Sequence, residues 1–315
     1  MATATTSLNS RRGHGRLKRV ALLAGLVIAG LILTVVSIFY VKPGIFVADL
    51  QRFRAWRMGL QQNTVVLQGQ KVHFVSGGEG KPLVLVHGLA GRSEDWFALI
   101  PLLIQDGYRI YALDLLGYGQ SARPDADYSI SFEENVVREF MDSQNLGQAD
   151  LAGWSMGGWI SLKFAADHPE RVHKLILLDS AGLKFDAVNA PLLRPRTEAG
   201  LAKMMQVLTP HPPTIPGFYA RDLLRDFARE DWIIDRALKS MYSGKDLMDG
   251  KLDSVTMPVL LIWGKQDVLT PPSIGEEMHQ WMAHSQLVVV DGCGHLAPVE
   301  CSGVVGQTMV NFLKN

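Results

Sequence analysis

A serine flanked by glycines is the first candidate for chemistry in this chain. The segment Gly153-Trp154-Ser155-Met156-Gly157-Gly158 follows an apolar run that begins at Ala149 and precedes an amphipathic run that ends at Ala166. This G-x-S-x-G pattern predicts a strand, a sharp turn and a helix, with Ser155 in a strained backbone conformation. The hydroxyl would stand at a helix N-terminus, where free N–H groups favour developing negative charge. The alternative is an ordinary glycine-rich turn that carries a serine.

A serine nucleophile needs a base within hydrogen-bond reach, and the base needs an acid that fixes its tautomer. His295 ends the glycine-rich segment 291–295, directly after the last predicted strand, and it alone among nine histidines has such a place. Asp267 follows the preceding strand, which gives the chain order Ser155, Asp267, His295. Asp179 is the rival acid, and we prefer Asp267 because Asp179 comes before a long insertion. For any single histidine, surface or core packing is the alternative.

Acyl transfer from a serine also needs two N–H donors for the oxyanion of the tetrahedral intermediate. We expect one from Met156, which follows the serine, and the other from Leu89, which follows His87-Gly88 after a predicted buried strand. A plain turn is the alternative for the His-Gly pair. Asp114 is expected to hold the loop from Gly117 to Ser121.

Composition excludes several other kinds of chemistry. The 315 residues are 47% hydrophobic and have zero formal net charge, so a packed core is expected and a nucleic-acid partner is not. The two cysteines, Cys293 and Cys301, match no zinc spacing, and no cofactor or metal is expected. We expect them to be free thiols, although a local disulfide stays open if the domain lies in an oxidising compartment.

The N-terminal region predicts a membrane anchor. Residues 1–19 form a basic tail, and residues 20–41 contain no charge, so a helix there would span about 33 Å of hydrocarbon. A cleaved signal peptide is the rival, but residues 37–43 offer no A-x-A cleavage site. The basic tail places the N-terminus in the cytoplasm and the remaining domain in the periplasm or outside the cell. Basic residues on the far flank, from Lys42 to Arg57, weaken this orientation.

Residues 42–63 predict an amphipathic juxtamembrane segment. Large apolar residues from Ile45 to Leu60 recur at near-helical spacing, and Arg52, Arg54 and Arg57 occupy other positions. Such a helix would lie among lipid headgroups, or it would pack on the body of the protein with its arginines in water.

The remaining chain predicts an α/β fold with an inserted lid. Residues 64–182 and 254–315 alternate strand-like and helix-like runs, which indicates a doubly wound, mainly parallel sheet. Ser93 would cap a helix that contains Trp96 and Leu103. Residues 183–253 break the alternation with helical, apolar pieces and a Pro-rich join. They predict a helical lid that overhangs the crevice where such sheets bind ligands, partly as its own core and partly as a substrate wall.

Taken together, these motifs resemble the α/β-hydrolase superfamily over residues 64–315. The residues on which this resemblance rests are Val86-His87-Gly88, Asp114 with Gly117 and Gly119, the G-x-S-x-G turn at 153–158, Asp267 and His295. The anchor, the aromatic and basic segment and the G-x-S-M-G-G elbow are similar to membrane-anchored monoacylglycerol lipases and related bacterial lipases. Epoxide hydrolases and haloalkane dehalogenases are disfavoured, because they place an aspartate where Ser155 stands.

The resemblance implies a cofactor-free serine esterase or lipase that acts on a small-molecule or lipid ester at a membrane. Alternatives on the same fold are a cofactor-free perhydrolase or haloperoxidase, and a carbon–carbon bond hydrolase. The G-G-x-G-P-G loop of the carbon–carbon bond enzymes is absent at Leu89 to Ser93. A non-catalytic ligand receptor is a further alternative.

Overall fold

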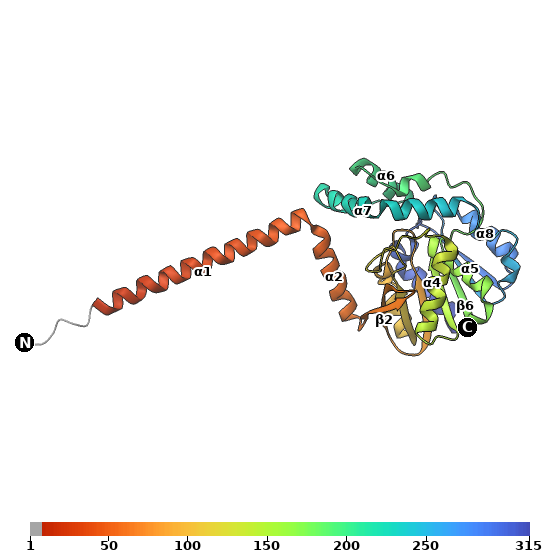
Figure 1. Cartoon of the computed structure of the whole chain (residues 1–315), viewed down its shortest axis with the longest axis horizontal. Helices are drawn as coiled ribbons and strands as arrows, with labels where there is room; N and C mark the ends of the chain where they lie inside the picture. The colour runs from red at the N-terminus through yellow and green to blue at the C-terminus, as the bar shows by residue number, and fades with distance from the viewer. Residues whose placement is uncertain (1–7) are drawn as a thin grey trace, which may run out of the picture.

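The N-terminal part of the chain is a long helix that projects away from the body of the protein. The computed structural model describes residues 8–315, so residues 1–7 of the expected basic tail lie outside the described residues. The first helix, α1, spans Leu8–Val41, and its stretch Val20–Val41 is apolar, with a mean hydropathy of 2.7, and unburied. Figure 1 shows α1 as an extended arm whose C-terminal end lies next to the body and whose N-terminal end points away from it. By length and composition this stretch is able to cross a bilayer.

The second helix, α2, spans Pro43–Arg57 and turns sharply away from α1, back toward the body (Figure 1). Ala55, and Leu60 just beyond the helix, are buried in the core, whereas Phe53 and Trp56 remain exposed. The helix therefore has one side on the protein and an aromatic side on the surface. The first strand begins at Gln61, three residues before the predicted start of the α/β region at residue 64.

One eight-stranded sheet organises the rest of the chain, in the order β1-β2-β4-β3-β5-β6-β7-β8. The pairs from β4 to β8 are parallel, and β1 and β2 add an antiparallel edge. The predicted doubly wound, mainly parallel sheet is confirmed. The strands are β1 Gln61–Leu67, β2 Gln70–Gly77, β3 Lys81–Val86, β4 Tyr108–Leu113, β5 Ala149–Trp154, β6 Val172–Leu178, β7 Val259–Gly264 and β8 Ser285–Val290.

Helices cover both faces of the sheet and bury two separate apolar clusters. Every residue of β5 and β7 is buried, which explains why these strands read as continuous apolar runs. The helices are α3 Ile100–Gln105, α4 Ile130–Ser143, α5 Met156–Asp167, α8 Pro272–Trp281, α9 Ala297–Glu300 and α10 Ser302–Lys314, with a 3₁₀ turn, η2, at Pro169–Arg171.

The helix predicted to follow a Ser93 cap is wrong in detail. Ser93 begins a 3₁₀ turn, η1, that ends at Trp96, and α3 is a separate helix. The Ser93 N–H donates instead to the buried carboxylate of Asp114 at 2.7 Å. A tertiary hydrogen bond therefore fixes this segment in place of a local cap.

The inserted segment between β6 and β7 contains two helices, α6 Glu198–Leu208 and α7 Gly217–Tyr242, which lie together over one side of the body (Figure 1). Short 3₁₀ turns flank them, η3 at Ala190–Leu193 and η4 at Leu252–Ser254. A small apolar cluster around Met204 belongs entirely to this segment, and a second one around Val207 also includes Leu269 from the loop after β7. Arg194 joins η3 to α7 through carboxylates of Asp231 and Asp235. The segment has a core of its own, as predicted for the lid.

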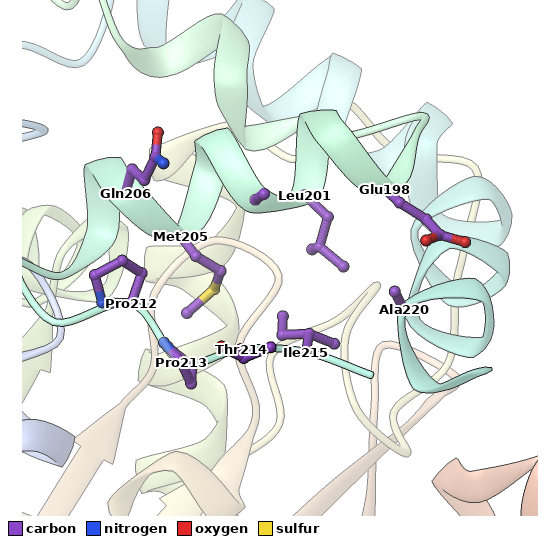
Figure 2. Close-up of a pocket in the computed structure, with 10 residues that line it drawn as sticks. Glu198, Leu201, Met205, Gln206, Pro212, Pro213, Thr214, Ile215 and Ala220 are labelled. Atoms are coloured by element: carbon purple, nitrogen blue, oxygen red, sulfur yellow. The ribbon is translucent and has the colours of Figure 1, made fainter. Parts of the chain in front are cut away.

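A cavity of 370 Å³ lies inside the lid, between α6 and the Pro-rich loop. Figure 2 shows Leu201 and Met205 pointing from α6 toward the loop that carries Pro213 and Ile215. None of the candidate site residues lines this cavity. Their site lies elsewhere, at the carboxyl ends of the strands.

Candidate active site

The serine lies in a sharp turn between β5 and α5. Ser155 has φ 56° and ψ −118°, so the strained conformation predicted from G-x-S-x-G is confirmed. A Cβ at Gly153 would come within 2.2 Å of the Gly157 carbonyl oxygen, and one at Gly157 within 2.2 Å of the Val86 carbonyl oxygen. Only glycine fits at these two positions, because neighbouring backbone passes where a side chain would begin.

The structure brings Ser155, His295 and Asp267 together as a hydrogen-bonded triad. His295 Nε2 lies 2.9 Å from Ser155 Oγ, and His295 Nδ1 lies 2.8 Å from Asp267 Oδ2. His295 and Asp267 are buried, whereas Ser155 is partly accessible. The histidine and the aspartate come from the loops after β8 and β7, because the carboxyl ends of parallel strands meet at one edge of the sheet.

The Asp267 carboxylate is held by its own turn. Its Oδ1 accepts the backbone N–H groups of Leu269 and Thr270, at 2.8 and 3.0 Å. Its Oδ2 accepts the Thr270 hydroxyl at 2.8 Å. The same hydroxyl oxygen lies 3.1 Å from His295 Nδ1. Thr270 was not among the predicted site residues, although Asp-x-x-Thr is a spacing at which a carboxylate accepts local turn N–H groups.

The rival acid, Asp179, does not contact His295. Its Oδ1 accepts the Gly264 N–H at 2.7 Å, and its Oδ2 has no hydrogen-bond partner within the described part of the chain. Burial, followed by the nearby charge of Asp267, raises the pKa of Asp179 well above its usual range. The protonated form of Asp179 is therefore favoured, and Asp267 is the carboxyl that contacts His295.

The two expected oxyanion donors lie beside the serine. Met156 is the first residue of α5, so its N–H has no acceptor within that helix. Leu89 lines the same cavity as Ser155. A Cβ at the preceding residue, Gly88, would lie 3.2 Å from the Ser155 Cβ, which shows how closely this loop approaches the nucleophile.

His87 fixes the loop that carries Leu89. Its Nε2 accepts the Leu115 N–H at 3.0 Å, so Nδ1 carries the proton and donates to the Gly88 carbonyl oxygen at 2.7 Å. Burial lowers the pKa of His87 to about 4, because the charged form would lose its hydration. A neutral histidine thus ties the loop after β3 to the loop after β4.

Asp114 holds the neighbouring loop, as predicted. Its Oδ2 accepts the Gln120 N–H at 2.8 Å, which confirms its expected contact with the segment from Gly117 to Ser121. The same oxygen lies 2.8 Å from Nδ1 of buried His73. Despite burial, hydrogen bonds and the His73 interaction lower the pKa of Asp114 to about 2.

The prediction of free thiols is wrong, because Cys293 and Cys301 form a disulfide with Cα atoms 6.3 Å apart. The short helix α9 turns the chain back and brings the two residues together, which forms the local disulfide that the sequence left open. His295 lies inside the closed loop. Glu300 supports the same loop by accepting the Gly294 N–H at 2.6 Å.

An apolar cavity of 450 Å³ opens beside Ser155. The core contributes Leu89, Trp159 and Leu269, and the lid contributes the larger share of the lining. The lid therefore forms most of the wall of this cavity. Its apolar members include Leu183, Phe185, Leu193, Leu238, Met241 and Leu247.

Comparisons with known proteins agree with this fold. The family model described as alpha/beta hydrolase fold matches residues 81–225, and one described as TAP-like protein matches residues 234–315. The chain belongs to the α/β-hydrolase family. A solved bacterial membrane phospholipase A superposes with a TM-score of 0.82 at 25% identity, over 93% of this hydrolase and 98% of that chain.

Curated relatives of this hydrolase fall into more than one class. Lipase 3 of Moraxella sp. strain TA144 is 28% identical over 237 residues, which cover 70% of this chain and 73% of the lipase. The 2-hydroxy-6-oxo-6-(2'-aminophenyl)hexa-2,4-dienoic acid hydrolase of Metapseudomonas resinovorans is 27% identical over 264 residues, or 78% of this chain and 88% of that enzyme. Family membership thus establishes a hydrolase fold, and the substrate must be argued from the site.

Proposed function

We propose that this hydrolase is a membrane-anchored serine esterase or lipase that cleaves carboxylic esters with an apolar acyl chain. The observation that carries the proposal is the Ser155–His295–Asp267 triad at the edge of an apolar cavity. Its hydrogen-bond distances are 2.9 Å from His295 Nε2 to Ser155 Oγ and 2.8 Å from His295 Nδ1 to Asp267 Oδ2. A serine activated by a neutral imidazole is the arrangement that acyl transfer requires.

In the proposed reaction, Ser155 Oγ attacks the ester carbonyl carbon while His295 Nε2 takes the hydroxyl proton. Asp267 orients the imidazole and stabilises the imidazolium. The oxyanion accepts hydrogen bonds from the N–H groups of Leu89 and Met156. His295 then gives its proton to the alcohol oxygen as the C–O bond breaks. Water, deprotonated by His295, cleaves the acyl-enzyme and releases the carboxylic acid and free Ser155.

The lining of the cavity supports an uncharged, apolar acyl group. Within residues 20–315, Lys184 is the one charged residue that lines it, and its side chain is exposed to solvent. Burial of an acyl chain against the lid residues contributes roughly 0.8 kcal/mol per methylene. We take a long-chain monoacylglycerol as the ester to test, because the lining is apolar and a relative is named a lipase.

The apolar stretch Val20–Val41 supports attachment to a bilayer by an uncleaved signal anchor. The Cys293–Cys301 disulfide supports a catalytic domain in an oxidising compartment, because such bonds are rare in the cytosol. Both agree with a cytoplasmic N-terminus and a periplasmic or extracellular domain.

Replacement of the nucleophile tests the assignment. Ser155→Ala is expected to reduce kcat/KM for a short p-nitrophenyl ester by about 10³ or more and to abolish labelling by a fluorophosphonate. Ser143→Ala, a change at an exposed serine, is the matched control. Normal turnover by Ser155→Ala would overturn the assignment. An activity that depends on added peroxide would instead favour a perhydrolase, and a wild-type protein that does not label would favour a receptor.

A carbon–carbon bond hydrolase is the second candidate, because the alignment with the dienoic acid hydrolase covers most of this chain and most of that enzyme. The substrate named for that relative is an acid, whereas the lining of this cavity is mainly apolar. A comparison of kcat/KM for such a dienoic acid and for a long-chain monoacylglycerol distinguishes the two. A higher value for the dienoic acid would favour the second candidate.

A further inference from the structure

A larger cavity, of 920 Å³, lies where α2, η1 and α7 meet. Lys42 and the first half of α2 contribute to it, as do the segment from Arg92 to Asp95 and the N-terminal half of α7. None of Ser155, His295 and Asp267 lines it. This junction cavity is therefore separate from the proposed ester-cleaving site.

The junction cavity is built by specific contacts between the anchor and the lid. The Gly44 N–H donates to Asp222 Oδ2 at 2.7 Å, and Arg225 Nη2 donates to the Val41 carbonyl oxygen at 2.5 Å. Beside them, Phe218 of α7 packs against Phe39 of α1, with ring centroids 5.6 Å apart. The last turn of α1 and the start of α2 are thus bonded directly to the lid helix.

The charges that line the junction cavity balance, with four basic and four acidic residues. Arg225 pairs with Asp222 and Arg229 with Asp226. Within residues 20–315, no ion pair or hydrogen bond joins the ammonium of Lys42 or the guanidinium of Arg92 to another side chain. Glu94 has one weak contact, from the Ser93 hydroxyl at 3.4 Å. Asp95 accepts the Arg92 backbone N–H, and despite burial the charges of Asp95 and Glu94 raise the pKa of Arg92. Lys42, Arg92 and Glu94 thus line the cavity without a close ion pair, and a ligand would compete with the Arg92–Glu94 attraction.

The position of the cavity indicates where that ligand comes from. Lys42 directly follows the apolar stretch Val20–Val41, so the cavity lies at the level of lipid headgroups if α1 spans a bilayer. Figure 1 shows that α2 turns away from the axis of α1 at this point and lies between α1 and the body. Ile45, Val47 and Leu223 add apolar surface to the cavity, which suits the first part of the acyl chains next to a lipid headgroup.

We propose that the junction cavity binds the headgroup of a zwitterionic glycerophospholipid with a primary ammonium. The phosphate accepts hydrogen bonds from Arg92 and Lys42, and the ammonium donates to Glu94. This inference rests on the membrane attachment in the proposed function and not on the ester chemistry. Because Arg92 and Leu89 share one loop, closed by a 3.0 Å hydrogen bond from the Gly91 N–H to the Gly88 carbonyl oxygen, a bound headgroup contacts anchor, lid and oxyanion loop together.

The test uses the full chain in detergent, with Ser155→Ala in every sample so that no lipid is cleaved. Native mass spectrometry would measure the Kd of phosphatidylethanolamine and of diacylglycerol with the same acyl chains. Lys42→Gln with Arg92→Gln is expected to weaken phosphatidylethanolamine binding about tenfold or more and to leave diacylglycerol binding unchanged. Lys203→Gln with Lys251→Gln is the matched control, because both residues are exposed and lie outside the cavity.

Glu94→Gln separates the two halves of the headgroup. It is expected to weaken binding of phosphatidylethanolamine more than binding of phosphatidylglycerol, which lacks the ammonium. Equal phosphatidylethanolamine affinity in the Lys42/Arg92 variant and its control, with both folded by circular dichroism, would overturn the proposal. Full competition by inorganic phosphate at millimolar concentration would also overturn it, in favour of a free-phosphate site. Loss of ester activity in other samples does not enter this readout.

Discussion

At the residue scale, two buried carboxyl groups lie behind the serine, and they differ in what surrounds them. Asp267 receives three hydrogen bonds from its own turn in addition to the contact with His295. Asp179 receives one, from the Gly264 N–H, and its second oxygen has no partner within residues 8–315. Burial and the nearby charge of Asp267 raise the pKa of Asp179, which favours its protonated form, whereas Asp267 is the carboxyl that its own turn holds against His295.

This difference predicts opposite outcomes for two similar changes. Asp267→Asn is expected to lower kcat for ester hydrolysis by about 10² to 10⁴, because the amide no longer fixes the His295 tautomer. Asp179→Asn is expected to change kcat by less than about tenfold, since an amide resembles a protonated carboxyl that does not contact His295. Steady-state kinetics on a short p-nitrophenyl ester would measure both. If Asp179→Asn lowers kcat more than Asp267→Asn does, the acid of the triad is Asp179.

His87 predicts a pH dependence of stability. Its pKa is lowered to about 4 in the fold, so between about pH 6.5 and 4 the unfolded chain binds a proton that the folded chain does not. This residue alone should lower the free energy of unfolding by about 1.4 kcal/mol per pH unit as the pH falls through that range.

Denaturant unfolding of the wild type and of His87→Asn would measure this effect. The wild type is expected to be the more stable at pH 7, and the gap should shrink toward pH 4.5, because the variant lacks the titrating group. His284→Asn, at an exposed histidine, is the matched control and should leave the pH dependence of the wild type unchanged. A gap that stays constant with pH would contradict a neutral, buried His87.

The residues that the sequence allowed us to predict are those placed by strand ends. Ser155, Asp267 and His295 each follow a predicted strand, and parallel strands bring such residues to one edge. Thr270 was missed, and the Cys293–Cys301 bond was only an open alternative to free thiols, because both depend on how particular loops turn. Loop geometry is set by tertiary contacts that no local pattern encodes.

At the element scale, the contact between β3 and α5 depends on the absence of a side chain at Gly157. Gly157→Ala is expected to abolish ester hydrolysis and to lower the melting temperature, because a Cβ would lie 2.2 Å from the Val86 carbonyl oxygen. Gly147→Ala is the matched control, since nothing lies within 4 Å of a Cβ there. Kinetics and thermal unfolding would measure both variants. Normal activity in Gly157→Ala would mean that α5 is able to shift without disturbing Ser155.

The disulfide constrains the loop that carries His295. The double change Cys293→Ser with Cys301→Ser is expected to lower the free energy of unfolding by about 2 to 3 kcal/mol, the loop-closure entropy for a bridge between residues 8 apart. Denaturant unfolding would measure this, with the wild type treated with reductant as a second sample. A KM and kcat that remain unchanged in the double variant would mean that Glu300 and the core hold the loop without the bridge.

Elements were easier to predict than their packing. Strands and helices of the α/β region have strong apolar patterns, and the predicted strand and helix from Ala149 to Ala166 match β5 and α5 closely, although the helix expected after Ser93 does not form. The cavity beside Ser155 is assembled from the two ends of the lid, around Phe185 and around Met241, together with the core residue Trp159. Contacts between segments so distant in the chain leave no signature in a local pattern, and the sequence predicted only that the lid would supply a wall.

At the scale of the whole molecule, the anchor, the lid and the sheet are connected parts. Ala55 and Leu60, at the end of α2 and just beyond it, are buried against the sheet, whereas Phe53 and Trp56 remain exposed. A chain that starts at Gln61 would lose this buried apolar surface and should be destabilised. A chain that starts at Pro43 keeps α2 and removes only α1, so it isolates the contribution of the membrane helix.

Removal of α1 alone should affect the enzyme only on substrates that reside in the bilayer. An ester dissolved in water gains nothing from a tether, but a long-chain monoacylglycerol resides in the bilayer, where a tether raises its effective concentration at the active site. The chain that starts at Pro43 is therefore expected to keep its kcat/KM for a water-soluble short-chain ester within about threefold. On monoacylglycerol in vesicles it should lose about tenfold or more. Equal loss on both substrates would mean that α1 supports the fold through its contacts with α7, and no loss on either would mean that α1 determines only where the enzyme is located.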